Sequence, residues 1–360
     1  MNKTPGLNID WGLLIPTFVL LLLSLITLSA LNMDFFRNQA IFSAVAILFF
    51  LFFSQTNYKV LKLYGFPIYI VSLIFLLAVL VIGTESRGAT RWVELFGGRL
   101  QFSEFFKPFL AVSLASFLSD RKNSTFGNLF SVLVFMLPVV FLIYLQPDLG
   151  NALIYVFVTI LTLILFGFPL RFFLTGLVFL SLITPIFWRF LHDYQKERIL
   201  TFLNPEKDPL GTSYNAIQSV IAVGSGMILG KGLGQGTQSG LKFLPERHTD
   251  FIFATISEQL GFVGSIVILA SFAFLILRIL KIYNNSNDSF SKMFAGISFF
   301  IILVQVFVNV GMNVGLLPVV GVTLPFVSYG GSSLLSSFIL LGLLSSVSRS
   351  EKEEGILEIK

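Results

Sequence analysis

Residues 230–264 read GKGLGQGTQSGLKFLPERHTDFIFATISEQLGFVG, and the rest of the chain is organised around them. The stretch begins with glycines, passes through seven ionisable side chains and ends in an apolar segment that starts at Phe251. Ionisable groups beside or inside a bilayer are costly, so their concentration favours a functional site. An ordinary solvated loop is the alternative interpretation. The place of Asp250, directly before a predicted membrane helix, favours the functional one.

The composition is that of an integral membrane protein. Of the 360 residues, 55% are hydrophobic and 12% are charged, whereas soluble domains average about 25% charged residues. The chain has no cysteine, so neither disulfides nor thiol chemistry enter the prediction. The net charge of +5 is modest and no run of five basic residues occurs, which argues against nucleic acid as a partner.

Uncharged stretches predict ten membrane-spanning helices, because a helix needs about 20 apolar residues to cross a bilayer. The first stretch has 23 uncharged residues, longer than the apolar core of a signal peptide, so we expect it to remain as a span. The predicted spans are 11–33, 38–58, 63–84, about 102–118, one within 123–147, one within 149–170, 172–189, about 251–277, and two within 293–348 that are separated by a break around 311–331. We therefore expect an all-α integral membrane protein with 1–360 as one polytopic membrane domain, in which 190–250 forms a large loop between the seventh and eighth helices.

Positive charges in the short loops predict the orientation of the chain. With both termini inside, the short inner loops hold eight Lys and Arg residues and the short outer loops hold four. Cytoplasmic loops carry the excess of such residues, so we expect both termini in the cytoplasm, and the 190–250 loop and Asp250 on the extracytoplasmic side. The eight are Lys59, Lys62, Arg121, Lys122, Arg171, Arg278, Lys281 and Lys292, and the four are Arg37, Arg87, Arg91 and Arg99.

Asp250 is the leading candidate for a catalytic residue. A carboxylate at the boundary between water and lipid can act as general base towards a hydroxyl group. Capping of the following helix by Thr249 or Asp250 is an alternative role that is compatible with catalysis. Glu246 and His248 are further candidates for the base. Glu246 ranks lower because it follows a proline in a predicted loop, and a lone histidine is more often a hydrogen-bonding residue than a metal ligand.

A second set of charged residues precedes and enters the fourth predicted span. Glu104 and Lys107 are spaced i, i+3, which predicts an ion pair on one helix face. This pair either stabilises the helix or lines an outward-facing polar cavity. Arg87, Arg91 and Arg99 lie just before it, and the planar guanidinium group suits phosphate. Alone these arginines fit contacts with lipid headgroups, but together with Lys107 they predict a binding site for an anion.

Other catalytic motifs are poorly supported. The sequence has no HExxH, P-loop or GxSxG motif in a suitable context, so zinc and nucleotide chemistry are not expected. The glycines between 224 and 236 contain a GxGxG pattern that does not follow a predicted strand. We expect instead a flexible backbone that approaches a ligand or reorders on binding.

Several motifs resemble those of the SEDS family (shape, elongation, division and sporulation), and the resemblance extends over nearly the whole chain. The motifs are GATRW at 88–92, QFSE at 101–104 with Lys107, QPDLG at 146–150, PERHTDF at 245–251, and Asn309 with GLLPVVG at 315–321 and PFVSYGGSS at 325–333. The last pattern is long and highly specific. Phe102 departs from the family, which usually has proline there. The PERHTDFIFA wording and the short tails favour the members that act in cell elongation.

The resemblance implies a peptidoglycan glycosyltransferase of the bacterial cytoplasmic membrane that polymerises lipid II on its outer face. Asp250 matches the essential aspartate of the family, and would deprotonate the acceptor hydroxyl while undecaprenyl pyrophosphate leaves the donor. Arg91, Arg99 and Lys107 would bind the pyrophosphate, and the resemblance implies that Glu104 is also needed for function. Glu246 and His248 are the remaining candidates for support of the cavity. A divalent cation, Mg²⁺ or Mn²⁺, is a possible helper, although the sequence shows no dedicated set of metal ligands.

The resemblance also implies partners. These are a class B penicillin-binding protein, the transpeptidase that cross-links the new strand, and other membrane proteins of the elongation complex. The 190–250 loop is expected to supply a mobile lid and part of the partner interface. The main alternative is a lipid II flippase, which needs polar groups across the membrane depth, whereas these charges cluster near one face. A non-catalytic scaffold for the penicillin-binding protein is the third hypothesis, and it leaves Asp250 and the arginines without a role.

Overall fold

The computed structural model of the chain describes residues 9–86, 89–95, 98–121, 125–191, 193–209, 211 and 213–358, so Arg87 and Lys122 lie outside the described residues. Ten apolar helices make up most of the described chain. Seven are long and apolar enough to cross a membrane, and three are shorter. The seven are α1 (Trp11–Leu31), α2 (Met33–Gln55), α4 (Gly65–Ile82), α7 (Phe126–Leu145), α13 (Ile252–Asn285), α14 (Ser289–Asn313) and α15 (Gly331–Glu358), and the three are α6 (Lys107–Ser119), α8 (Leu149–Leu165) and α9 (Leu170–Phe190). They occupy the ten predicted stretches, which confirms the predicted multi-pass helical fold.

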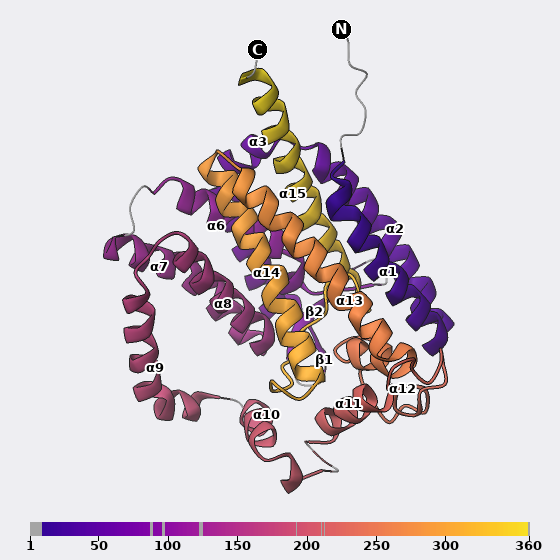
Figure 1. Cartoon of the computed structure of the whole chain (residues 1–360). Coiled ribbons are helices and arrows are strands. Elements are labelled where there is room, and N and C mark those ends of the chain that lie inside the picture. The colour runs from indigo at the N-terminus through magenta and orange to yellow at the C-terminus, as the bar shows by residue number, and fades with distance from the viewer. Residues whose placement is uncertain are drawn as a thin grey trace.

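The helices pack around α14 and α15. α15 lies against α2, and α14 contacts α6, α8 and α13 (Figure 1). The membrane segment of α15 is almost wholly buried, whereas less than a third of the apolar stretches of α2 and α4 is buried. This exposure suits helices that face lipid, because apolar side chains on the rim of a bundle are not driven inward there.

The start of α1 and the end of α15 lie at one end of the bundle, and α11 and α12 lie at the other (Figure 1). At the first of these two ends, three side chains connect the start of α1 with α13 and α15. Arg278 of α13 forms an ion pair with buried Asp10, and Ser348 of α15 donates a hydrogen bond to the same carboxylate at 2.7 Å. The predicted placement of both chain ends on one side of the bundle therefore agrees with the helix arrangement.

The shorter elements connect the apolar helices. Helix α3 (Tyr58–Leu63) precedes α4, and the segment between α9 and α13 contains α10 (Asp193–Leu203), η1 (Pro205–Lys207), α11 (Tyr214–Ser225) and α12 (Thr237–Gly240). A small antiparallel sheet, which the sequence analysis did not predict, follows α4 in the order β1 (Thr84–Ser86), β2 (Ala89–Leu95), β3 (Gly98–Leu100). In its register Thr84 pairs with Trp92, and Val93 pairs with Leu100. Two of its strands have only three residues, too short for a periodic signal.

The fourth predicted span is broken into two helices, so the expected continuous helix over 102–118 is wrong. Helix α5 (Phe102–Phe105) ends at Phe106, and α6 begins at Lys107. Pro108 lies in the first turn of α6. Because proline has no backbone N–H, it cannot donate to the carbonyl of Glu104, and the hydrogen-bond ladder is interrupted there. The break directs the α5 side chains into the charged site described below.

Helix α13 is kinked at Gly261, where φ is 68° and ψ is −159°. The backbone of the segment after α11 supplies hydrogen-bond partners at this kink. The N–H groups of Lys231 and Gly232 donate to the carbonyls of Glu258 and Gln259 at 2.9 and 3.0 Å, and Phe262 N–H donates to the Met227 carbonyl at 2.8 Å. Backbone groups that a kink releases inside a membrane need such replacement partners. Among the glycines between 224 and 236, Gly226, Gly230 and Gly236 pack closely on α13, where an added Cβ would lie within 2.5 Å of α13 atoms.

Gly230→Ala is expected to destabilise this packing by about 1–3 kcal/mol, because the residue has φ of +79° and an added Cβ would lie 2.1 Å from the Gln259 carbonyl oxygen. Limited proteolysis of the 226–247 segment measures the effect, and faster cleavage is the expected result. Gly127→Ala is the matched control, because Gly127 lies in α7 with nothing within 4 Å of an added Cβ. Equal cleavage of the two variants would contradict the role of Gly230.

Candidate active site

Asp250 lies at the end of a turn that leads into α13, at the end of the bundle opposite the paired chain ends. Its backbone carbonyl accepts hydrogen bonds from the side-chain amides of Asn309 and Asn313 of α14, both at 3.0 Å. The predicted caps of α13, Thr249 and Asp250, lie two residues and one residue before the observed N-cap position. The N-cap is Phe251, which makes no side-chain cap hydrogen bond, and Asn313 Oδ1 accepts from the Ala254 N–H at 3.0 Å. Two buried asparagines thus fix the backbone at Asp250.

The residues just before Asp250 are held by the segment between α14 and α15. Ser328 Oγ donates to the Thr249 carbonyl at 2.7 Å, and the Tyr329 N–H donates to the His248 carbonyl at 2.9 Å. The Asp250 carboxylate lies beside Gly321, where an added Cβ would be 3.4 Å from Oδ2. The segment between α14 and α15 therefore both supports the turn before Asp250 and borders the Asp250 carboxylate.

Glu246 and His248 lie in the turn just before Asp250. Glu246 has φ of +49°, and its carbonyl accepts from the N–H groups of Thr249 and Phe251. Its Oε2 accepts from Thr249 Oγ1 at 3.0 Å. The His248 ring stacks on Phe35 of α2, with the ring centroids 4.3 Å apart and the planes 5° from parallel. These contacts connect the turn to itself and to α2.

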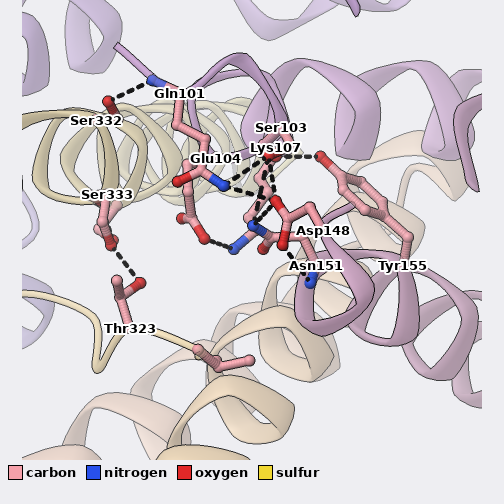
Figure 2. Close-up of polar contacts among 12 residues, drawn as sticks. Gln101, Ser103, Glu104, Lys107, Asp148, Asn151, Tyr155, Thr323, Ser332 and Ser333 are labelled. Atoms are coloured by element: carbon pink, nitrogen blue, oxygen red, sulfur yellow. Dashed lines mark hydrogen bonds and ion pairs between the residues drawn. The ribbon is translucent and has the colours of Figure 1, made fainter. Parts of the chain in front are cut away.

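Asp148 is the centre of a buried polar network (Figure 2). Its Oδ2 accepts from Gln101 Nε2 at 2.6 Å, from Ser103 Oγ at 2.8 Å and from Asn151 Nδ2 at 2.8 Å. Tyr155 of α8 extends the network, because its hydroxyl donates to the Ser103 carbonyl at 3.0 Å. The network joins the start of α5 to the start of α8 in a region where water cannot supply hydrogen bonds.

The predicted Glu104–Lys107 pair is present across the break between α5 and α6. Lys107 Nζ donates to Glu104 Oε1 at 2.7 Å, and the two residues are only 2% and 4% exposed. Arg91 of β2 approaches the network from the sheet, with Nη1 3.8 Å from Asp148 Oδ1. Its Nε is buried and has no hydrogen-bond partner among the described residues. Arg91 therefore keeps donor capacity beside a buried charged cluster.

Arg99 is placed differently from Arg91 and Lys107. Its Nε lies 3.4 Å from Glu94 Oε1 across the β2–β3 pairing, and the side chains are 61% and 59% exposed. It lies on the surface of the small sheet, where a salt bridge is weak. The structure thus brings Arg91, Glu104 and Lys107 to the Asp148 network and leaves Arg99 at its outer edge.

The segment between α14 and α15, together with the first turn of α15, joins the Asp250 turn to the Asp148 network. Ser332 Oγ accepts from the Gln101 N–H at 2.9 Å, and Ser333 bonds to Thr323 at 2.9 Å (Figure 2). A Cβ added at Gly150, next to the network, would lie 2.6 Å from the Val320 carbonyl oxygen. Since Gly321 borders Asp250, this backbone lies between the two sets of charged residues.

Several of these residues were not predicted as site residues. In the sequence, Asp148 is singled out only as part of the QPDLG motif, although a single carboxylate between two apolar stretches is a signal that predicts a site residue. Asn309 was likewise noted only as part of a motif. Gln101, Asn151 and Asn313 are neutral, and their roles depend on contacts between distant segments.

Glu258 has a structural position in the first turns of α13. It is fully buried and accepts from the N–H groups of Gln238 and Ser239 at 2.8 Å each, and from Ser239 Oγ at 2.7 Å. Lys231 Nζ lies 3.3 Å from its Oε1. This carboxylate anchors α12 on α13 and so fixes the chain that leads to Asp250. Among the described residues, no group of three or more His, Asp or Glu side chains is arranged to hold a metal ion.

The chain is similar to known proteins over almost its whole length. Residues 7–353 match the model of the FtsW/RodA/SpoVE family, described as cell cycle protein. The peptidoglycan glycosyltransferase MrdB of Escherichia coli K12 is 40% identical over 359 residues, which cover 96% of this chain and 97% of that protein.

Two solved structures share the fold. A chain from a peptidoglycan synthase complex, solved in work on how polymerization and crosslinking are coordinated, has a TM-score of 0.84 and 32% identity, covering 96% of this chain and 99% of that one. The rod shape determining protein RodA of Thermus thermophilus has a TM-score of 0.74 and 27% identity, covering 97% and 99%. This chain therefore belongs to the FtsW/RodA/SpoVE family of cell cycle proteins, the SEDS family that its motifs resemble.

Proposed function

We propose that this chain, a peptidoglycan glycosyltransferase of its family, polymerises lipid II during cell elongation with Asp250 as general base. The observation that carries the proposal is the position of Asp250. Its carboxylate borders Gly321, and its backbone is fixed by Asn309 and Asn313. A carboxylate on a backbone that two buried asparagines fix, with the 320–321 backbone between it and the Arg91 and Lys107 cations, suits glycosyl transfer with an anionic leaving group.

In the proposed reaction, the acceptor is the 4-hydroxyl of N-acetylglucosamine and the donor is the anomeric carbon of N-acetylmuramic acid. Asp250 takes the hydroxyl proton as the oxygen attacks this carbon, whose configuration inverts. The bond to the undecaprenyl pyrophosphate breaks, and its oxygen takes the electron pair. Each cycle thus forms one glycosidic bond and releases one pyrophosphate-linked lipid.

Arg91 and Lys107 are proposed to stabilise the negative charge that develops on the pyrophosphate. Arg91 has a buried Nε without a partner among the described residues, and a guanidinium binds phosphate with two parallel hydrogen bonds. Lys107 is held by Glu104 at 2.7 Å, so we assign Glu104 the role of orienting the ammonium group. Arg99 is proposed to meet the substrate at the outer rim, and Glu246 and His248 to position the turn.

The placement in the membrane and the partner are part of the same proposal. We infer that the chain is one membrane domain with cytoplasmic termini, and that the 190–250 segment and Asp250 face outward in the bacterial cytoplasmic membrane. The excess of Lys and Arg in the predicted inner loops supports this orientation. A class B penicillin-binding protein and other elongation-complex proteins are the proposed partners, because a similar chain occurs in a peptidoglycan synthase complex.

The experiment that tests this function is polymerisation of labelled lipid II by the purified chain, alone and with a penicillin-binding protein whose catalytic serine is removed. Glycan polymer with or without the partner is the expected result. Translocation of lipid II in sealed vesicles without any polymer would instead support the flippase hypothesis. Neither polymer nor translocation, in a folded complex, would leave the scaffold as the better hypothesis.

Arg91→Ala is expected to reduce kcat/KM for lipid II polymerisation about 100-fold, whereas Arg99→Ala is expected to reduce it less than tenfold. The difference follows from burial, because Arg91 contacts the Asp148 network and Arg99 forms an exposed ion pair. An exposed pair contributes about 0–1 kcal/mol, and loss of one transition-state donor costs about 10²–10³-fold. Steady-state kinetics on lipid II measure both variants. A larger loss for Arg99→Ala would move the pyrophosphate site to the sheet surface.

A further inference from the structure

A cleft of about 930 Å³ lies at the end of the bundle opposite Asp250, between the ends of α6, α8, α13 and α14. Ser289 and Lys292 at the start of α14 line it, whereas Asn313 at the other end of the same helix binds the Asp250 carbonyl. At 1.5 Å rise per residue, Lys292 and Asn313 are separated by about 30 Å, the thickness of a bilayer core. The cleft is therefore at the opposite membrane boundary and belongs to a different site.

Two half-buried cations line the cleft. The Arg121 guanidinium lies 3.5 Å from the centroid of the Phe117 ring, and Lys292 Nζ lies 5.2 Å from that of Tyr283. Arg121 Nη1 donates to the Phe117 carbonyl, a structural bond that closes the last turn of α6. Neither cation forms a salt bridge in the part of the chain that the structure describes. The aromatic rings hold both charges in place without neutralising them.

The acidic residues nearby do not cancel this charge. Asp288 caps α14 through Ser291 N–H and lies 3.8 Å from Lys62 Nζ, so its charge is shared with another cation. Asp120 is exposed. Burial lowers the pKa of Arg121 and the charge of Asp120 raises it, but a guanidinium stays protonated in either case. The N-terminal end of α14 adds a partial positive charge at the same cleft.

The surroundings of the cleft indicate what fills it. Thr125 lines the cleft, and the next turns of α7 carry Phe126 and Phe130, which are 66% and 62% exposed. Large exposed aromatic side chains on a membrane protein face lipid or its boundary with water. An occupant that offers an anionic group to Arg121 and Lys292 and apolar chains to the α7 surface satisfies both features.

We propose that this cleft binds the phosphate headgroup of an anionic membrane phospholipid, with Arg121 and Lys292 as the binding residues. The chemistry that recognises it is that of a phosphate oxygen with donors from one guanidinium and one ammonium group. The volume admits a headgroup, since ligand sites range from about 300 to 1,000 Å³. A bound lipid here fixes the α13–α14 connection from the side opposite the active site.

The test is binding of phosphatidylglycerol to the purified full chain in detergent, followed by native mass spectrometry. Wild type is compared with the Arg121→Ala/Lys292→Ala double variant and with phosphatidylcholine as the neutral lipid. We expect phosphatidylglycerol binding to fall about fivefold for each cation removed and about thirtyfold for both. The Arg121→Lys/Lys292→Arg variant keeps both charges and is expected to retain most of the binding, which separates charge from damage to the fold.

The matched control is Arg171→Ala/Lys281→Ala, which removes two exposed cations that do not line the cleft. Equal loss in this control would mean general attraction of anionic lipid and would overturn the site. Unchanged binding in the Arg121→Ala/Lys292→Ala variant, or equal binding of phosphatidylcholine, would overturn it too. Excess inorganic phosphate is the last arm. Inorganic phosphate would be the ligand under three conditions: it displaces phosphatidylglycerol, it loses binding in the Arg121→Ala/Lys292→Ala variant, and it binds as tightly as the lipid. In that case the site takes a soluble anion. Because the readout is lipid binding, it is independent of polymerisation.

Discussion

Asp250→Asn is expected to reduce the rate of lipid II polymerisation by about 10²–10⁴-fold, the contribution of a general base. The amide has nearly the same shape as the carboxylate, but it cannot take the proton from the hydroxyl group of the acceptor sugar. The hydrogen bonds from Asn309 and Asn313 go to the Asp250 backbone carbonyl, which the substitution leaves in place. The fold is therefore expected to persist, and the thermal unfolding midpoint measures whether it does.

Two comparisons sharpen this experiment. Asp120→Asn changes an exposed carboxylate at the opposite end of the bundle and is expected to leave polymerisation unchanged. Glu246→Gln tests the other carboxylate of the turn, whose side chain accepts from Thr249 Oγ1 at 3.0 Å. We expect Glu246→Gln to cause a moderate loss of polymerisation, because the turn becomes less rigid while Asp250 remains as the base. Full activity of Asp250→Asn together with inactivity of Glu246→Gln would transfer the role of base to Glu246.

The ten spans could be predicted because a bilayer imposes one strong rule on the sequence. A lipid-facing stretch must be long, helical and almost uncharged, and every stretch of this kind corresponds to an apolar helix in the structure. The break at Phe106 was missed because it depends on one proline inside such a stretch. The small sheet was missed because strands of three residues carry no periodicity.

The candidate site was predictable only in part. Charged residues are conspicuous in an apolar sequence, so the pattern predicts Asp250, Arg91, Glu104 and Lys107 as site residues. The Asp148 network was not predicted, because it is assembled from the starts of α5, α8 and α15. The sequence also does not reveal that Arg99 is exposed, because this exposure follows from the pairing of β2 with β3. Spacing along the chain identifies neighbours within one helix but says nothing about such long-range contacts.

Asp148→Ala is expected to lower the free energy of unfolding by about 3–5 kcal/mol and to abolish polymerisation, the second large effect. The residue is only 1% exposed, and its carboxylate accepts hydrogen bonds from Gln101, Ser103 and Asn151. Removal takes the acceptor from the Ser103 hydroxyl and leaves the Gln101 and Asn151 amides with Ser103 Oγ as their remaining acceptor in this network. Asp34→Ala, which removes an exposed carboxylate from the first turn of α2, is the matched control and is expected to change stability little.

The Arg91→Ala/Asp148→Ala double variant distinguishes the charge of Asp148 from its hydrogen bonds. Arg91 Nη1 lies 3.8 Å from Asp148 Oδ1, so the single Asp148→Ala variant leaves a guanidinium without its counter-ion. If that uncompensated charge causes much of the loss, removal of Arg91 restores part of the stability, and the two effects are not additive. If the hydrogen bonds dominate, the double variant is at least as unstable as Asp148→Ala. We expect partial recovery of the unfolding midpoint without recovery of polymerisation, because the recovered fold still lacks the guanidinium proposed to bind pyrophosphate.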